Sequence, residues 1–223
     1  MISAEREEMR MTERESISQT EFLKQLRAGR SDFSSCDFDG TLFLGNMSLR
    51  KELSLAGAKI DGDLLIRRLK VPVFLNLRGI EVREEIIVTE SKILGPLDFS
   101  RVNTGTVRVS DTKVDGYLDF HEAVVFNAVF LGSSHVVGQT SFNRAKIGRV
   151  GICKNKLDFG LLMNGCAVES LDFRENRLRH KIECGQSLDL ALKFFLLGHK
   201  VEIDHTPIAK LLSLLSASAP VSS

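Results

Sequence analysis

The stretch Ala58-Lys-Ile-Asp-Gly-Asp-Leu-Leu-Ile66 is followed, at a constant step of eleven positions, by Leu69-Lys-Val-Pro-Val-Phe-Leu-Asn-Leu77 and by Ile80-Glu-Val-Arg-Glu-Glu-Ile-Ile-Val88. In each stretch, apolar residues stand at the first, third, seventh and ninth positions. Of the 52 positions that this spacing defines along the chain, 46 are apolar, whereas a composition of 43% hydrophobic residues alone would give about 22. The step is one position shorter after Val102 and after Ala145. The thirteen units start at Cys36, Met47, Ala58, Leu69, Ile80, Ser91, Val102, Thr112, Ala123, Ser134, Ala145, Asn155 and Cys166.

The spacing indicates β-strands. On a helix the four positions would point in different directions, whereas in extended chain residues two apart point to the same side. Two units are therefore expected to close one coil of about 22 residues, stacked on the next at ~4.8 Å. A glycine stands midway through many units, where a positive φ or a crowded corner is expected. These glycines are Gly40, Gly62, Gly95, Gly105, Gly116, Gly138 and Gly148.

The segment Leu26-Arg-Ala-Gly-Arg-Ser-Asp-Phe33, followed by Ser34-Ser-Cys-Asp-Phe38, is similar to the usual opening of pentapeptide-repeat proteins. Units such as Gly57-Ala-Lys-Ile-Asp-Gly-Asp-Leu64 resemble the 11-residue variants of that family. The resemblance covers about residues 33–174. It implies an all-β solenoid, a right-handed four-sided β-helix with short helical caps at both ends. It leaves the function open, because the family includes effectors, topoisomerase-protecting proteins and many members without assigned activity.

Both ends of such a β-helix expose strand edges that need a cover. Ser18-x-x-Glu21 predicts a capping box that opens a helix to about Ala28, with Gly29 as its stop, while residues 1–17 are expected to be frayed. Ser187 predicts the start of an apolar helix through Leu197, followed by a strand at 200–203 and a second helix over about 207–215. We therefore divide the chain into a charged segment with a capping helix (1–32), the β-helix (33–174) and a C-terminal helical cap, dimerisation segment and tail (175–223).

Composition narrows the function classes. The net charge of +1, from 30 basic and 29 acidic residues, argues against a strongly acidic DNA mimic and makes direct nucleic-acid binding unexpected. No apolar run reaches the ~18–20 residues of a membrane-spanning helix, and the N-terminus lacks the apolar core of a signal peptide. The four cysteines form no CxxC pair, so neither a zinc site nor a disulfide framework is expected. A cytoplasmic location is the expectation.

One motif carries a competing hypothesis. Asp37-Phe-Asp-Gly-Thr-Leu42 resembles the first motif of haloacid-dehalogenase phosphatases, in which Asp37 would be the nucleophile and Asp39 the acid/base beside Mg²⁺. In that family a buried apolar strand precedes the motif, whereas Asp32-Phe-Ser-Ser-Cys36 precedes it here. We interpret the two acids as solvated. The histidines are not spaced as metal ligands, and no catalytic partner stands near them in the sequence. They are His121, His135, His180, His199 and His205. No catalytic, cofactor-binding or metal-binding residue is therefore expected.

Two outward columns stand out when alternate units are aligned. The position after the start of the even units forms a candidate anion-facing column: Ser48 and then Lys70, Lys92, Lys113, His135 and Lys156. Neighbouring like charges ~5 Å apart repel by about 0.8 kcal/mol in water, which nearby acids can relieve. The alternative interpretation is an ordinary solvated face. The eighth position of the odd units forms a candidate protein-contact stripe, with side chains simply lying flat as the alternative: Phe43, Leu65, Ile87 and Phe130, interrupted by Arg108.

The leading hypothesis is a non-enzymatic interaction module, a rigid rod that presents flat faces to a protein partner. The alternative is a DNA-mimic-like protein that binds and protects gyrase, because residues 188–203 resemble the dimerising helix and short strand that end such family members. A homodimer is expected through the C-terminal helix, which is apolar almost all round, unless the segment at about 207–215 folds back over it. The candidate dimer contacts are Leu188, Leu192, Phe194 and Phe195.

Overall fold

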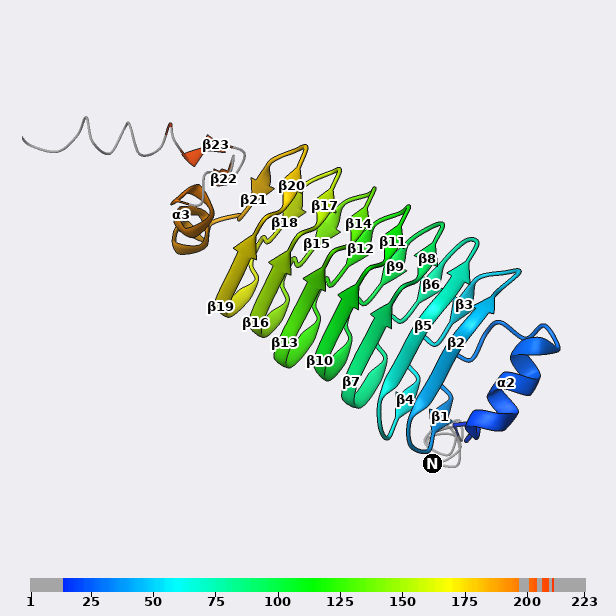
Figure 1. Cartoon of the computed structure of the whole chain (residues 1–223). Helices are drawn as coiled ribbons and strands as arrows, with labels where there is room; N and C mark the ends of the chain where they lie inside the picture. Colours follow the sequence, from blue (N-terminus) through cyan, green and yellow to red (C-terminus); the bar gives the residue numbers. More distant parts are fainter. Residues whose placement is uncertain (1–13, 197–200, 204–205, 209, 211–223) are drawn as a thin grey trace, which may run out of the picture.

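The computed structural model describes residues 14–196, 201–203, 206–208 and 210, and its body is a parallel β-solenoid of about seven turns (Figure 1). The expected all-β solenoid is confirmed. Each turn supplies one long strand, and the long strands pair in parallel along the rod. They are β2 (Leu42–Ser48), β5 (Leu64–Val71), β7 (Glu81–Thr89), β10 (Asn103–Ser110), β13 (Val124–Gly132), β16 (Lys146–Cys153) and β19 (Ala167–Arg174).

Short strands complete each turn and stack in the same way. Paired residues are 22 apart, as in Lys70 and Lys92, or 21 apart, as in Lys92 and Lys113, which confirms that two sequence units make one coil. Two short series belong to the sheet of the long strands. In the first, β1 (Asp37–Phe38) and β4 (Lys59–Ile60) stack onto the start of β7. The second stacks onto the end of β5 and consists of β8 (Lys92–Ile93), β11 (Lys113–Val114), β14 (His135–Val136), β17 (Lys156–Leu157) and β20 (Arg177–Leu178). A third series forms a second sheet: β3 (Leu53–Ser54), β6 (Leu75–Asn76), β9 (Leu97–Asp98), β12 (Leu118–Asp119), β15 (Thr140–Ser141), β18 (Leu161–Leu162), β21 (Ile182–Glu183), β22 (Val201–Ile203) and β23 (Thr206–Pro207).

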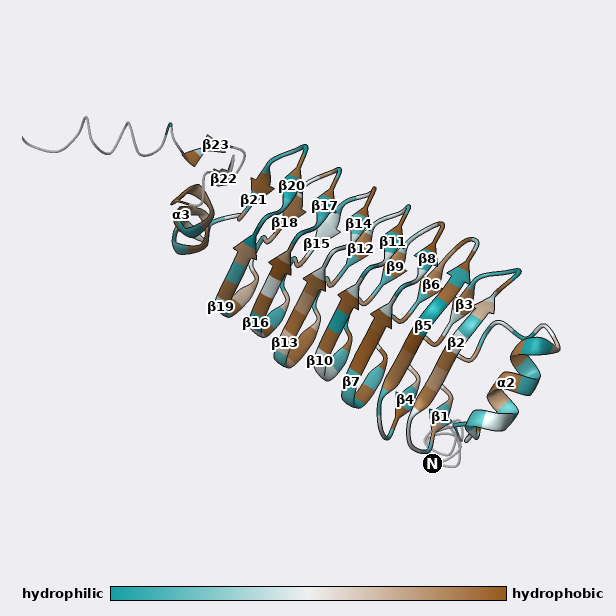
Figure 2. Ribbon diagram, in the orientation of Figure 1, coloured by the Kyte–Doolittle hydropathy of each residue, from teal (hydrophilic) through white to brown (hydrophobic). Residues whose placement is uncertain are grey.

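The core fills the inside of the coil, and the predicted inward positions line it. All but five of the 52 are buried, and Figure 2 shows brown, apolar residues over much of β2 and β5 and over the second half of β7. Phe99, Phe120 and Phe142 occupy the same position in three successive coils and stack at 4.9 and 4.8 Å between ring centroids. The five half-buried positions lie in the first and last coils, where a neighbouring coil is missing on one side: Met47, Leu49, Cys166, Val168 and Leu171.

The chain turns its corners with a left-handed residue just before each unit. Among the described residues eleven of these are not glycine, for example Glu90 with φ 51° and Ser133 with φ 48°. At the odd corners a backbone β-turn closes the bend, as in the bond from the Val102 N–H to the Phe99 carbonyl at 3.1 Å. Left-handed residues at this position were not predicted from the sequence.

Side chains hold the even corners. The Thr112 N–H donates to the Ser134 hydroxyl at 3.2 Å, and that hydroxyl donates to the Gly132 carbonyl at 2.9 Å. Equivalent bonds link successive coils, so that each buried N–H at the corner finds an acceptor. We call this column the polar ladder; its members are Ser91, Thr112, Ser134, Asn155 and Asn176.

The mid-unit glycines serve close packing between coils. A Cβ on Gly138 would lie 2.5 Å from the backbone of Gly116, one coil earlier, although Gly138 has no positive φ. The same crowding without positive φ holds for Gly62, Gly95, Gly105, Gly116 and Gly148. Gly40 is the exception, with φ 78° and open space around it. Of the two predicted reasons for these glycines, close approach is therefore the usual one.

The N-terminal cap forms as predicted. Helix α2 (Gln19–Arg27) begins after Ser18, whose side chain accepts the Glu21 N–H at 3.3 Å, and Gly29, with φ 102°, follows its C-cap residue Ala28. Phe22 is fully buried and packs edge-on against Phe33 at 4.6 Å. The expectation of a frayed start is wrong for residues 14–17, because the Ile17 N–H donates to the Asp37 carbonyl at 2.8 Å and extends the sheet.

The β-helix continues beyond the predicted boundary at residue 174. A further unit starts at Asn176 and forms β20 and β21, and it buries Ile182 in β21 and Cys184 directly after β21. Helix α3 (Leu188–Leu196) follows. Strand β22 then pairs in parallel with β21, at the place of the strand predicted over residues 200–203. Thr206 and Pro207 form β23, antiparallel to β22, and Ile208 and Lys210 are helical, which agrees with a second helix that starts close to residue 207. Residues 209 and 211–215 of that predicted helix lie outside the described residues.

Candidate interaction surfaces

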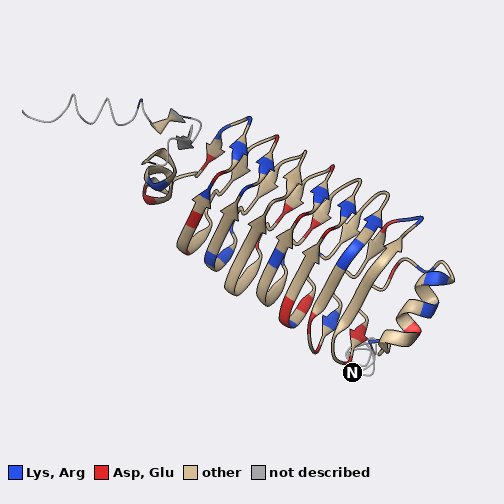
Figure 3. Ribbon diagram, viewed as in Figure 1, with Lys and Arg blue, Asp and Glu red and all other residues tan. Residues whose placement is uncertain are grey.

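The predicted anion-facing column lies on one straight line. Lys70, Lys92, Lys113, His135 and Lys156 are direct partners in successive coils, and the column continues to Arg177 on β20. We call these six residues the basic ladder. Figure 3 shows it as a row of blue along the short strands, interrupted at β14, where His135 stands. Backbone pairing fixes this line, so the charges recur at the ~4.8 Å spacing of the sheet.

In the C-terminal half of the basic ladder, acidic residues meet Lys113, His135 and Lys156, whereas Arg177 has no carboxylate within ion-pair distance among the described residues. Asp158 accepts a hydrogen bond from His135 Nε2 at 2.8 Å and lies 3.5 Å from Lys156 Nζ and 3.3 Å from Arg179 Nε. The hydrogen bond from His135 and the nearby cations hold the pKa of Asp158 below its ordinary value. Asp115 forms an ion pair with Lys113. This half of the column therefore behaves as the solvated, charge-balanced face that the alternative interpretation describes.

The N-terminal half of the basic ladder differs. Among the described residues, no carboxylate lies within ion-pair distance of Lys70 or Lys92. The residues beside them in the coil are apolar, with Val73 51% and Leu94 37% exposed. Cations and exposed apolar side chains thus share one area at this end of the rod.

The candidate protein-contact stripe also lies in one line, across the long strands. Phe43 pairs with Leu65, Leu65 with Ile87, and Arg108 stands between Ile87 and Phe130. Phe43 is 42% exposed, whereas the other three apolar members are half-buried. The Phe130 ring lies over Gly151, where an added Cβ would be 2.8 Å from it, and the Arg108 guanidinium lies 4.7 Å from the ring centroid. Phe130 thus lies flat within the stripe.

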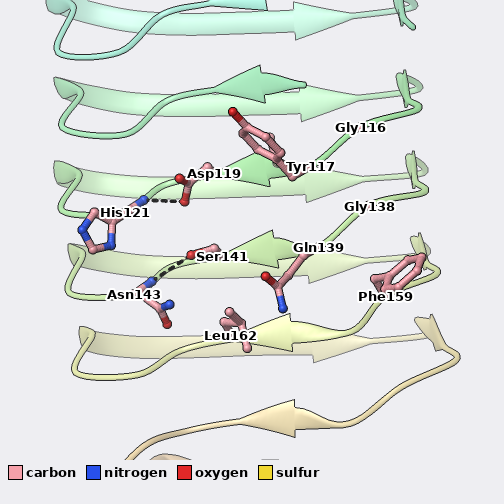
Figure 4. A pocket seen from close by; sticks show the side chains of 11 residues that line it. Gly116, Tyr117, Asp119, His121, Gly138, Gln139, Ser141, Asn143, Phe159 and Leu162 are labelled. Atoms are coloured by element: carbon pink, nitrogen blue, oxygen red, sulfur yellow. Dashed lines mark hydrogen bonds between the residues drawn. The ribbon is translucent and has the colours of Figure 1, made fainter. Parts of the chain in front are cut away.

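A shallow groove of about 550 Å³ lies on the second sheet, over β12, β15 and β18. Figure 4 shows Tyr117, Gln139 and Leu162 on successive coils, one below another, with Phe159 to one side of them. Asp119 accepts the His121 N–H at 2.9 Å. Partial burial and the charges of Asp98 and Asp119 raise the pKa of Tyr117, so the phenol stays protonated. Sequence reasoning missed this groove, because its walls come from residues two coils apart.

The acids and histidines considered for catalysis either contact other side chains or lie far from one another. Asp37 lies 2.5 Å from Arg14 Nε, while Asp39 is exposed. His180 stacks on Phe159 at 5.4 Å, and His199 and His205 lie outside the described residues. Burial raises the pKa of the Cys166 thiol to about 11, as expected for core cysteines. Within the described ranges, no three His, Cys, Asp or Glu side chains are grouped to hold a metal ion.

The candidate dimer contacts differ in their availability. Phe194 is fully buried and packs edge-on against Phe173 at 5.1 Å, so its ring is used within the chain. Leu192 and Phe195 are half-buried, and the side chain of Leu188 lies outside the described set. Leu196 is 81% exposed. Ile208 is buried in the chain's own core, so part of the segment after β22 does fold back.

No protein-family model matches this chain, and no curated protein is significantly similar to it in sequence. The resemblance to pentapeptide-repeat proteins therefore stays a prediction about family, while the solenoid fold stands on the structure. In the part of the chain that the structure describes, no helix has the length and apolar character needed to cross a membrane.

Proposed function

We propose that the chain is a protein-interaction module, a rigid β-helical rod that presents flat faces to a protein partner. One observation carries the proposal: backbone ladders hold Phe43, Leu65 and Ile87 on one line across neighbouring long strands. Each outward side chain has a fixed distance to its neighbours because the strand that carries it is paired with the next strand of the stripe. When a partner binds several of these side chains, the rod therefore loses little conformational entropy.

A pull-down with matched variants tests this role. The double variant Leu65→Glu/Ile87→Glu places charges in the stripe, and Ser54→Glu/Asn76→Glu places the same charges at the equivalent positions on β3 and β6 of the second sheet. We expect the stripe variant to lose proteins that the wild type and the control variant both retain. Thermal melting of all three proteins checks that the rod is intact. Identical retention by all three would contradict the stripe as the contact face.

We propose that no catalysis accompanies this role. The engagement of Asp37 by Arg14 and the scatter of the histidines support this view. Purified protein is assayed with a generic phosphate ester and Mg²⁺. Hydrolysis that the variant Asp37→Asn abolishes would overturn the proposal in favour of a phosphatase.

Binding and protection of gyrase is the second candidate. The apolar helix α3 followed by the short strand β22 supports it, and the basic ladder opposes an acidic DNA mimic. A supercoiling assay with gyrase and a quinolone separates the two roles. Cytoplasmic location and a homodimer through the C-terminal segment belong to the same proposal; the exposed Leu196 supports the dimer.

A further inference from the structure

We infer that the N-terminal end of the rod binds an acidic, amphipathic helical segment of a partner protein. This inference rests on the proposed function and names the class of partner, at a different face from the protein-contact stripe. The surface consists of the cations Arg27, Arg50, Lys51, Lys70 and Lys92 and the exposed apolar residues Val73 and Leu94; we call it the basic–apolar patch.

The members of the patch are neighbours by backbone pairing. Ser48 pairs with Lys70, and Lys70 pairs with Lys92. The Leu49 N–H donates to the Lys70 carbonyl at 2.8 Å, and the Leu94 N–H donates to the Val71 carbonyl at 2.9 Å. These bonds place Arg50 and Lys51 one coil before the Pro72–Val73 corner, and Leu94 one coil after it.

A cleft of about 690 Å³ opens between the end of α2 and the β2–β3 loop, next to these residues. Leu26, Met47 and Leu49 line it and are only half-buried. Arg27 lies on its α2 side, and Arg50 and Lys51 lie on its loop side. Glu52 is the acid on its rim. The cleft offers apolar side chains a place to insert beside the cations.

Charge decides the kind of partner. Most Lys and Arg side chains elsewhere on the rod meet a carboxylate, as Arg101 meets Glu122 at 2.8 Å. Among the described residues the five cations of the patch have no carboxylate within ion-pair distance, so their charge is available to an anionic partner. Exposed Val73 and Leu94 beside them favour a partner with apolar side chains as well as acids.

Spacing favours a helix. Successive cations along the coils are ~4.8 Å apart, and one turn of a partner's helix rises about 5.4 Å. Carboxylates one turn apart on that helix can therefore each meet a cation on successive coils, over the two or three coils of the patch. An extended strand repeats same-side residues at about 6.7 Å and loses this match after one coil. Helix-in-groove binding with a charged rim is the mode that fits.

The test uses the full-length protein and a fluorescently labelled amphipathic peptide with Leu and Glu on one helical face. A peptide with Gln in place of Glu is the first control. The variant Lys70→Gln/Lys92→Gln is compared with Lys113→Gln/Lys156→Gln, which removes the same two charges from the neutralised half of the same ladder. We expect the first variant to bind about tenfold more weakly in fluorescence anisotropy and the second to bind nearly as wild type.

An equal loss of peptide affinity in both Lys→Gln variants would mean that the peptide responds only to the overall positive charge, and this would overturn the inference. Equal affinity for the Gln peptide and the Glu peptide would also overturn it. Binding that occurs only after removal of residues 1–13, which contain four Glu, would assign the patch to the chain's own N-terminus and also overturn it. The variant Leu65→Glu/Ile87→Glu must bind the peptide normally. If the peptide does not bind, but the stripe variant still loses proteins in the pull-down, the proposed interaction module stands. Only the inferred class of partner is then wrong.

Discussion

The hydroxyl of Ser134 accepts the backbone N–H of Thr112 from the preceding coil at 3.2 Å and donates to the Gly132 carbonyl at 2.9 Å. Both bonds are made at a buried corner. The polar ladder therefore supplies the hydrogen bonds that the bent backbone cannot make by strand pairing.

Ser134→Ala should destabilise the rod by about 1–3 kcal/mol, because the Thr112 N–H would stay buried without an acceptor. Urea denaturation monitored by circular dichroism measures the change. Ser48→Ala, at an exposed outward position on β2, is the control and should leave the midpoint unchanged. Equal midpoints for both variants would mean that the ladder is not a source of stability.

Gly138→Ala should cost about 1–3 kcal/mol, because the new Cβ would lie 2.5 Å from the Gly116 backbone and the coils would have to separate. Gly132→Ala is the matched control. The nearest atom to its new Cβ, Ser110 Cβ, would be at 4.0 Å, which is ordinary contact. A comparison of melting temperatures decides, and a neutral Gly138→Ala would contradict the close stacking of coils.

Acid should weaken the C-terminal half of the rod through Asp158. Because the pKa of Asp158 is lower in the folded chain than its ordinary 3.8, the carboxylate stabilises the fold above that value. The stabilisation is lost as the pH falls through the lowered folded-state pKa. Stability measured from neutral pH down to acid should therefore drop less steeply in Asp158→Asn. An identical slope would show that the His135 contact does not act on folding.

Self-association is expected through the C-terminal segment. Leu196 is 81% exposed, and burial of such a side chain against a second copy would gain about 1.5–3 kcal/mol. Sedimentation of the full chain should give a dimer, and Leu196→Glu should shift it to monomer. A monomeric wild type would favour the fold-back cap that buried Ile208 begins.

Much of the fold follows from the sequence because burial requires an apolar side chain at most inward positions, 46 of the 52. The polar ladder was harder to predict. Ser91, Thr112, Ser134 and Asn155 are four of the six polar residues at the predicted inward positions, and they read as exceptions until the corner bonds are known. The boundary at residue 174 came too early because the next unit starts with polar Asn176 after a shortened step.

The candidate surfaces were predictable as columns, since alternate units must share a face. The division of the basic ladder into a charge-balanced half and an unpaired half was not predictable. Whether Lys156 is neutralised depends on Asp158, whereas Lys92 has apolar Leu94 at the same offset. The cleft beside α2 also depends on where the cap settles against the first coil, which no repeat pattern specifies.

The core of this rod repeats with every sequence unit, whereas its surface repeats only with every coil of two units, and this difference limits how the gene can change length. Loss of a single unit would keep every later inward residue inward. It would also exchange the two outward faces beyond that point, so that Lys113 would align with the long strands and Phe130 with the short ones. The corner serines and asparagines would move under corners closed by backbone turns. Only the loss or gain of a whole coil, as between Lys70 and Lys92 or between Lys92 and Lys113, keeps surfaces and corners in phase.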